Sequence, residues 1–230
     1  MTSQRISDER ARKSFQDLNR LNNVRKSICL VVLASSSMLL TTTPTFAADL
    51  QTSIQHGQQI AQTCVACHGI DGNTASPALY PNLAGQAPAY LELQLVNFKS
   101  GERPNAIMKG FAASLKDSDM HDVSEYFGAQ TAKPQASSNR DLEEEGKRIF
   151  TKGSSAGAPA CASCHGAQGH GQAAFPRVAS QPASYTLEQL HVYRDAPKFN
   201  NPLATVMKGV AVKLSEDEMK SVSAYIATIP

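Results

Sequence analysis

Hydrophobic residues recur at helical spacing in several segments of the chain, and the alternation that marks β-strands is nearly absent. Between residues 117 and 130, for example, Met120, Val123 and Phe127 fall on one helical face. The same spacing, helped by Pro near two of the starts, predicts helices over residues 50–64, 88–99, 117–130, 142–151, 182–193 and 215–228. The sequence therefore predicts an all-α fold.

The predicted helices form two similar sets because the chain contains an internal repeat. The matching positions are Gly57 and Gly146, Pro81 and Pro176, Gln86 and Gln181, Tyr90 and Tyr185, Leu95 and Leu190, and the triplets at 108–110 and 207–209. A repeat of this length indicates two tandem domains rather than a solenoid. We assign the domains to residues 48–129 and 141–230. The polar segment 130–140, with Pro134, Ser137 and Ser138, is expected to be an exposed linker.

The two halves are expected to begin their last helix differently. In the second half Ser215 and Glu218 form a capping box. Lys116 takes the place of Ser215 in the first half, so we expect Asp117 or Ser118 to cap that helix instead.

Residues 1–47 have the layout of a secretory signal peptide. A long basic leader precedes an apolar run from Ile28 to Leu40, and Thr45-Phe46-Ala47-Ala48 offers a cleavage site after Ala47. The run is shorter than the roughly 20 residues that a transmembrane helix needs. An uncleaved N-terminal anchor is the alternative, and the true start of translation is left open. We expect export to the periplasm.

Removal of this leader changes the charge balance and the cysteine count. The chain has 22 Lys and Arg against 20 Asp and Glu, of which the leader holds seven and three, leaving 15 against 17. A slightly acidic mature chain does not suggest binding to nucleic acid. Cys29 lies in the leader, so all four mature cysteines belong to the two motifs described next.

Each half contains one C-x-x-C-H motif. Cys64 and Cys67 precede His68 in the first, and Cys161 and Cys164 precede His165 in the second, as Cys64-Val65-Ala66-Cys67-His68 and Cys161-Ala162-Ser163-Cys164-His165. This motif is the attachment signature of c-type haem. The thiols add to the two vinyl groups of the haem, and the histidine becomes the proximal ligand of the iron. The sequence therefore predicts two covalently bound haem c groups.

A bare C-x-x-C could also belong to a zinc site or to a redox dithiol. Paired zinc motifs stand about 15–20 residues apart, much closer than these two copies. A thioredoxin-type dithiol would follow a strand, and no β-rich run precedes either motif. Haem attachment is therefore the better interpretation of both motifs.

The mature chain offers two methionines per half as a sixth ligand for each iron. Met120 and Met219 fall on the apolar face of the last helix, where methionine fills core. Met108 and Met207 lie in loop-like stretches with Pro and Asn, and we assign these two to the irons. The other mature histidines, His56, His121, His170 and His191, have no counterpart in the opposite half, which argues against a second histidine ligand.

With these residues in view, the chain from residue 48 to 230 resembles the dihaem cytochrome c4 family, which has two class I cytochrome c domains in tandem. The resemblance rests on both C-x-x-C-H motifs, Pro81-Asn82-Leu83-Ala84-Gly85-Gln86, the Met-Lys-Gly triplets, and Tyr126 and Tyr225 in the last helices. It implies that His68 and Met108 bind one iron and His165 and Met207 the other. It also implies that the carbonyls of Pro81 and Pro176 accept a hydrogen bond from these histidines, and that the first and last helices meet at Gly57 and Gly146. Val178-Ala179-Ser180-Gln181 departs from the pattern, which leaves the contacts of that loop open.

An iron held by histidine and methionine has no open position for a substrate, so it transfers single electrons. We expect a soluble, monomeric periplasmic carrier, not an enzyme, between a quinol-oxidising complex and a terminal oxidase or reductase. The alternatives are an electron-accepting subunit of a dehydrogenase and a dihaem peroxidase. Peripheral association with a membrane is left open. Lys109 and Lys208, which follow the assigned methionines, are candidates for docking charges.

Overall fold

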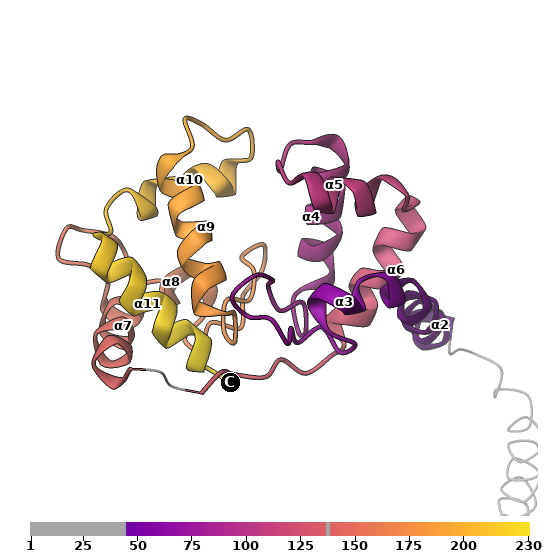
Figure 1. Cartoon of the computed structure of the whole chain (residues 1–230), viewed down its shortest axis with the longest axis horizontal. Helices are drawn as coiled ribbons and strands as arrows, with labels where there is room; N and C mark the ends of the chain where they lie inside the picture. Colours follow the sequence, from indigo (N-terminus) through magenta and orange to yellow (C-terminus); the bar gives the residue numbers. More distant parts are fainter. Residues whose placement is uncertain (1–44, 137–138) are drawn as a thin grey trace, which may run out of the picture. The chain divides into compact units, whose positions relative to one another are not determined.

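The computed structural model describes residues 45–136 and 139–230, and these residues are mainly helical (Figure 1). The first half contains α2 (Thr45–Ile60), the 3-10 helix η1 (Ala61–Thr63), α3 (Val65–His68), α4 (Pro88–Ser100), α5 (Ala106–Ala113) and α6 (Asp117–Gly128). The second half contains α7 (Arg140–Lys152), α8 (Ala162–His165), α9 (Ala183–Asp195), α10 (Pro202–Ala211) and α11 (Glu216–Thr228). Within the described ranges the β-structure is one isolated bridge between Gln172 and Phe175. The predicted all-α fold is confirmed.

The halves repeat the same helix contacts. In the first half α4 contacts α5 and α6, and in the second half α9 contacts α10 and α11. In the second half α7 also contacts α11. Figure 1 shows α9 beside α10 and α7 beside α11. The repeat in the sequence is therefore a repeat in structure.

The first and last helices of each half touch at a glycine. A Cβ atom built on Gly57 of α2 would overlap the carbonyl oxygen of Asp122 on α6. A Cβ atom on Gly146 of α7 would overlap the carbonyl oxygen of Ser221 on α11 in the same way. Both close approaches need the absence of a side chain, and the expected contacts of the first and last helices are confirmed.

Each half buries its own apolar cluster between these helices. In the first half Val123, Tyr126 and Phe127 of α6 pack with Ala61. In the second half the cluster contains Ile149 and Phe150 of α7, Leu190 of α9, and Met219, Val222 and Ile226 of α11. Domains of this size bury a modest share of their surface, so a large apolar group added to each core would stabilise it.

The N-terminal caps of α6 and α11 differ, and the cap of α6 is not the one that we expected. In α11 the Ser215 hydroxyl accepts from the Glu218 N–H at 3.2 Å, and the Glu218 carboxylate accepts from the Ser215 N–H at 2.9 Å, which confirms the capping box. In α6 the Asp119 carboxylate accepts from the Lys116 N–H at 3.0 Å. The prediction of Asp117 or Ser118 as the cap was wrong, because Lys116 is itself the N-cap residue and the carboxylate of Asp119, the third residue of the helix, accepts from its N–H.

The segment that joins α6 to α7 is hydrogen-bonded to both halves. Lys133 forms an ion pair of 2.6 Å with Asp71, and its backbone N–H donates to Asn73. Further along, the Gln135 N–H donates to the carbonyl of Ala227 in α11 at 2.8 Å. Most of its described residues are exposed, as expected of a linker, and these bonds restrain it against both halves.

The predicted signal peptide lies mostly outside the described residues, which begin at Thr45, the first residue of α2. Among the described residues, none of the helices has the length and apolarity needed to cross a membrane.

Candidate functional site

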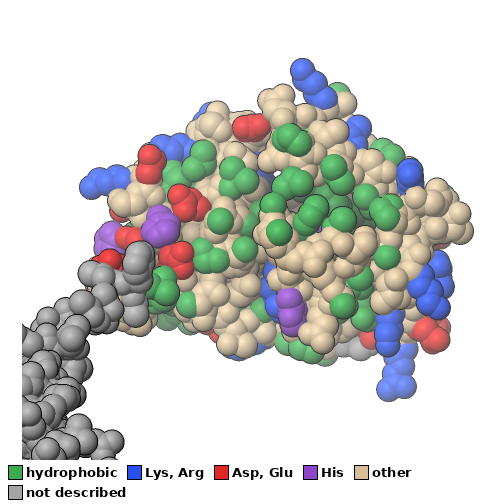
Figure 2. Space-filling view, turned by 180° about the vertical axis from the view of Figure 1, so that it is seen from behind, with side chains coloured by type: hydrophobic (Ala, Val, Ile, Leu, Met, Phe, Trp, Pro, Cys, Tyr) green, Lys and Arg blue, Asp and Glu red, His purple; other side chains and the backbone are tan. Residues whose placement is uncertain are grey.

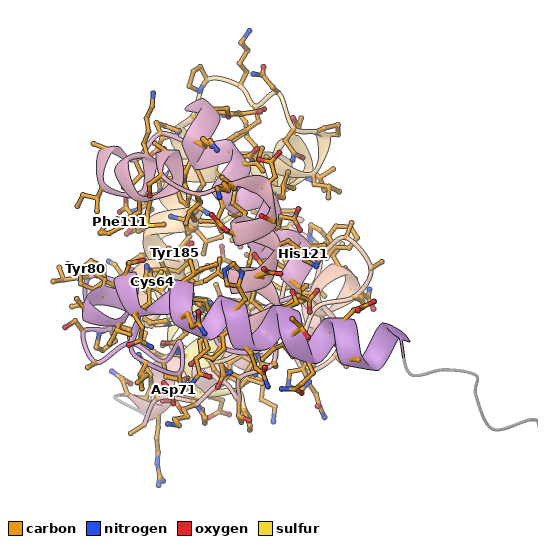
Figure 3. The ribbon with its side chains drawn as sticks, turned by 90° about the vertical axis from the view of Figure 1, so that its right-hand side faces the viewer. Cys64, Asp71, Tyr80, Phe111, His121 and Tyr185 are labelled. Atoms are coloured by element: carbon orange, nitrogen blue, oxygen red, sulfur yellow. The ribbon has the colours of Figure 1, made fainter. Side chains whose placement is uncertain are left out.

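Each C-x-x-C-H motif occupies one helical turn. The N–H of Cys67 donates to the Cys64 carbonyl at 3.2 Å, and the N–H of His68 donates to the same oxygen at 2.9 Å. Cys164 and His165 repeat this arrangement on Cys161, with the same two distances of 3.2 and 2.9 Å. Because residues three apart lie on one face of a helix, each turn presents both of its thiols on the same side. Cys64, labelled in Figure 3, follows the 3-10 helix η1 and directly precedes α3.

All four cysteines of the motifs are half-buried. Burial raises the pKa of the Cys64 thiol, and it raises the pKa of the Cys161 thiol to about 11. None of the four cysteines is paired in a disulfide, so all of them are available to bind a haem.

The two histidines are held by equivalent hydrogen bonds. Nδ1 of His68 lies 3.0 Å from the carbonyl oxygen of Pro81, and Nδ1 of His165 lies 2.9 Å from that of Pro176. A carbonyl can only accept, so Nδ1 carries the proton and the lone pair is on Nε2. Each histidine is 7% exposed. Burial lowers the pKa of both rings, against a smaller opposing effect of the proline bonds, which favours the neutral imidazole that binds metals.

An aromatic ring stands beside each histidine. The rings of His68 and Tyr80 have centroids 6.1 Å apart with an edge-on geometry, and His165 and Phe175 repeat that distance. Both aromatic residues directly precede the prolines that bind the histidines. The backbone bond and the aromatic edge together fix the orientation of each imidazole. The sequence reasoning did not single out Tyr80 or Phe175, although their matching positions in the repeat could have indicated them.

The loops that carry the prolines are closed onto the motif by backbone bonds. Leu83 N–H donates to Gly72 at 2.7 Å, and Val178 N–H donates to Gly169 at the same distance. Gly85 and Ser180 occupy equivalent positions with φ of 67° and 62°. Ser180 is fully buried and its hydroxyl donates to the Ile229 carbonyl at 2.8 Å, a bond that helps to hold a non-glycine residue in the left-handed region. The departure from the family pattern therefore preserves the loop conformation.

The four methionines fall into two classes. Met120 and Met219 are 0% exposed in the cores of the two halves, and the sulfur of Met219 lies 3.8 Å from the Arg194 guanidinium. Met108 and Met207 are half-buried. They do not lie in loops, as the sequence suggested, but in the short helices α5 and α10. Asn105 and Asn201 are the N-caps of these helices. Asn and Pro also occur in loops, which is why their presence predicted loops here.

These observations fit a covalently held haem in each half. Two free thiols share one face of a turn, and a buried neutral imidazole next to them keeps its Nε2 lone pair for a metal. A half-buried methionine at an equivalent position is available to complete the set. A haem held by these side chains would also enlarge the small apolar core of each half.

Comparison with known proteins gives the same result. The family model for cytochrome c matches the chain twice, at residues 54–129 and 143–230. Cytochrome c4 of Stutzerimonas stutzeri is 36% identical over 202 residues, which cover 83% of this chain and 95% of that protein. This chain belongs to the cytochrome c4 family. It therefore carries two covalently bound haem c groups, one on Cys64 and Cys67 and the other on Cys161 and Cys164.

The likeness to cytochrome c4 extends to three dimensions. The crystal structure of reduced recombinant cytochrome c4 from Pseudomonas stutzeri matches with a TM-score of 0.72 and 34% identity, over 77% of this chain and 98% of that one. A second kind of relative, the thiosulfate dehydrogenase electron acceptor of Stutzerimonas stutzeri strain A1501, is 35% identical over 86% of this chain and 94% of its own length. The relatives of this chain thus include proteins named as cytochrome c4 and proteins named as electron acceptors of thiosulfate dehydrogenase.

Proposed function

We propose that this cytochrome c4 homologue is a periplasmic one-electron carrier between a quinol-oxidising complex and a terminal oxidase or reductase. His68 and Met108 would bind one iron, and His165 and Met207 the other. The observation that carries the proposal is the pair of half-buried methionines at equivalent positions of α5 and α10. With methionine in both halves, neither iron keeps a position for substrate.

Each protein group has a distinct part in this proposal. The cysteines fix the haem covalently, and the bound haem supplies one-electron oxidation and reduction. The Pro81 and Pro176 carbonyls keep Nδ1 of each histidine protonated, so the lone pair on Nε2 would be free to bind the iron. A methionine ligand raises the reduction potential, which suits an acceptor of electrons from quinol oxidation.

The domain boundaries that go with this function are also a proposal. Residues 1–47 would be the signal peptide, 48–129 the first cytochrome domain, 130–140 the linker and 141–230 the second domain. The family matches at residues 54–129 and 143–230 support two domains with a short connection.

Large apolar side chains beside the assigned methionines support contact with partner proteins. Ile107 and Phe111 on α5 are 63% and 45% exposed, and Leu203 and Val206 on α10 are 38% and 51% exposed. Figure 2 shows hydrophobic side chains gathered on one face of the molecule. An apolar surface of this kind favours brief docking with other redox proteins. We propose that the carrier acts as a monomer and meets its partners there.

The second candidate is an electron-accepting subunit of a dehydrogenase. It is favoured by the relatives named as thiosulfate dehydrogenase electron acceptors, which align with most of this chain. A dihaem peroxidase is less well supported, because such an enzyme would need one iron without its methionine.

A redox titration of the purified protein, followed in the haem Soret and α bands, tests the carrier. The expected result is two one-electron steps per chain, with both haems low-spin and six-coordinate throughout. Purification under mild conditions separates the two candidates, since a permanent subunit would remain bound to a dehydrogenase. A high-spin haem in the native protein would contradict both.

A further inference from the structure

Two glutamines at equivalent positions reach across from one half of the repeat to the other. Gln86 of the first half and Gln181 of the second each follow the loop that carries the histidine-binding proline. The Gln86 side chain donates from Nε2 to the Arg177 carbonyl at 2.8 Å, and its Oε1 accepts from the Arg177 N–H at 2.8 Å. One amide therefore binds both backbone groups of one residue in the other half.

Gln181 makes the reciprocal contact. Its Nε2 donates to the Asn82 carbonyl at 2.7 Å, and its Oε1 accepts from the Asn82 N–H at 3.2 Å. Asn82 and Arg177 are themselves equivalent, since each directly follows a proline that binds a histidine. Gln86 is 5% and Asn82 6% exposed, so water cannot readily replace these bonds.

The peptide group that each glutamine binds is the one that holds the histidine. In the Pro81–Asn82 peptide, the carbonyl accepts from His68 Nδ1 and the N–H donates to Gln181. In the Pro176–Arg177 peptide, the carbonyl accepts from His165 Nδ1 and the N–H donates to Gln86. A continuous chain of hydrogen bonds thus runs from each histidine, through one peptide, to a side chain of the opposite half.

Hydrogen bonds in such a chain strengthen one another. Donation from the peptide N–H increases the negative charge on the carbonyl oxygen, because the two atoms share a conjugated system. A stronger acceptor draws the Nδ1 proton and makes the imidazole a more basic ligand. A more basic ligand favours ferric over ferrous iron and so lowers the reduction potential.

We propose that Gln181 lowers the potential of the haem bound by His68, and that Gln86 lowers the potential of the haem bound by His165. Both glutamines are positioning residues that act through a peptide of the other half. The proposal rests on the histidine ligation proposed above. The shorter bond, from Arg177 N–H to Gln86, is expected to have the larger effect.

The variants Gln181→Leu and Gln86→Leu test this assignment. Each variant removes the two hydrogen bonds of one glutamine amide, while the histidines, their prolines and the methionines stay in place. In a spectroelectrochemical titration, Gln181→Leu is expected to raise one of the two midpoint potentials and Gln86→Leu to raise the other. The double variant should raise both. Should a leucine variant fail to fold, Gln86→Met or Gln181→Met, with an unbranched side chain of similar length, has the same expected result.

Gln189→Leu is the matched control. Gln189 of the second half binds Arg103 of the first at 3.1 Å, so it also bridges the halves, but it touches neither proline peptide. Its loss should leave both potentials unchanged. Unchanged potentials in the Gln86 and Gln181 variants would overturn the proposal, and so would an equal shift of both potentials in either one. A control variant that shifted the potentials as much would assign the effect to the interface as a whole. Absorption spectra of the wild-type protein test histidine and methionine ligation separately.

Discussion

Gly57 lies directly against the carbonyl oxygen of Asp122, where the first helix of the chain's first half crosses the last. The same contact recurs between Gly146 and Ser221 in the second half. At both crossings the backbones of the two helices are in direct contact. A side chain at either glycine would therefore push the first helix of the half away from the last.

Alanine at either crossing is therefore expected to destabilise the protein. Gly57→Ala and Gly146→Ala should each lower the free energy of unfolding by about 1–3 kcal/mol or more, the usual cost of overpacking. Gly110→Ala and Gly209→Ala are matched controls, since a Cβ atom at these helical glycines meets nothing within 4 Å. They should be neutral or stabilising by up to about 1 kcal/mol. Denaturant unfolding of the four variants measures this, and equal losses in all four would contradict the close approach.

The two classes of methionine should respond differently to substitution. Met108→Ala and Met207→Ala are each expected to remove about half of the near-infrared band of ferric iron bound to methionine, because two equivalent sites share it. Met120→Ala and Met219→Ala should keep the band and instead cost about 2–5 kcal/mol of stability, as core truncations do. Near-infrared absorption and unfolding curves separate the outcomes. Loss of the band in the core variants would reverse our choice of ligands.

The ion pair between Lys133 and Asp71 should stabilise the protein only above acidic pH. The hydrogen bond from Lys133 is the largest cause that lowers the pKa of the Asp71 carboxyl. A lowered pKa means that the stabilisation is present above the unfolded value of about 3.9 and is lost as the pH falls through the folded value. Lys133→Met should cost at most about 1 kcal/mol at pH 7, since the pair is largely exposed. Urea unfolding at neutral and acidic pH should show this difference shrink progressively as the pH falls below about 4, and a difference independent of pH would refute the pairing.

Of the two lysines that follow the assigned methionines, Lys109 is the better candidate for steering partners. It is exposed, whereas the ammonium of Lys208 donates to the carbonyls of Arg194 and Ala196. Lys109→Glu is therefore expected to slow bimolecular electron transfer severalfold at low salt and little above roughly 0.15 M, where charges are screened. Lys208→Glu should chiefly loosen the connection between α9 and α10. Stopped-flow rates at several salt concentrations measure both, and an unaffected Lys109→Glu rate at low salt would remove the steering role.

Much of this fold could be predicted from local sequence. The haem motifs are consecutive residues, and the longer helices show their spacing directly, as Met120, Val123 and Phe127 do in α6. The short helices α5 and α10 were missed because they span less than three turns and begin with Asn and Pro, which also mark loops.

Contacts between residues that are far apart in the sequence could not be predicted from local sequence patterns. Gln86 and Gln181 were recognised as matching positions of the repeat, but nothing in their neighbourhoods indicates that each binds a backbone in the other half. Likewise, no nearby residue reveals that the Lys208 ammonium is bound by two carbonyls. Such contacts depend on how helices meet in space, and the spacing of hydrophobic residues does not encode that.

The central claim is that both irons are closed by side chains of their own domains, which makes the protein a carrier and not an enzyme. Carbon monoxide binding to the fully reduced native protein at neutral pH tests this most directly. If Met108 and Met207 bind the irons as proposed, access to either iron requires local opening at one of them, which costs free energy. We therefore predict slow and partial binding in a stopped-flow experiment, with Met108→Ala as the fast-binding control. Fast, stoichiometric binding of carbon monoxide to one of the two haems in the native protein would contradict the account and favour an enzyme.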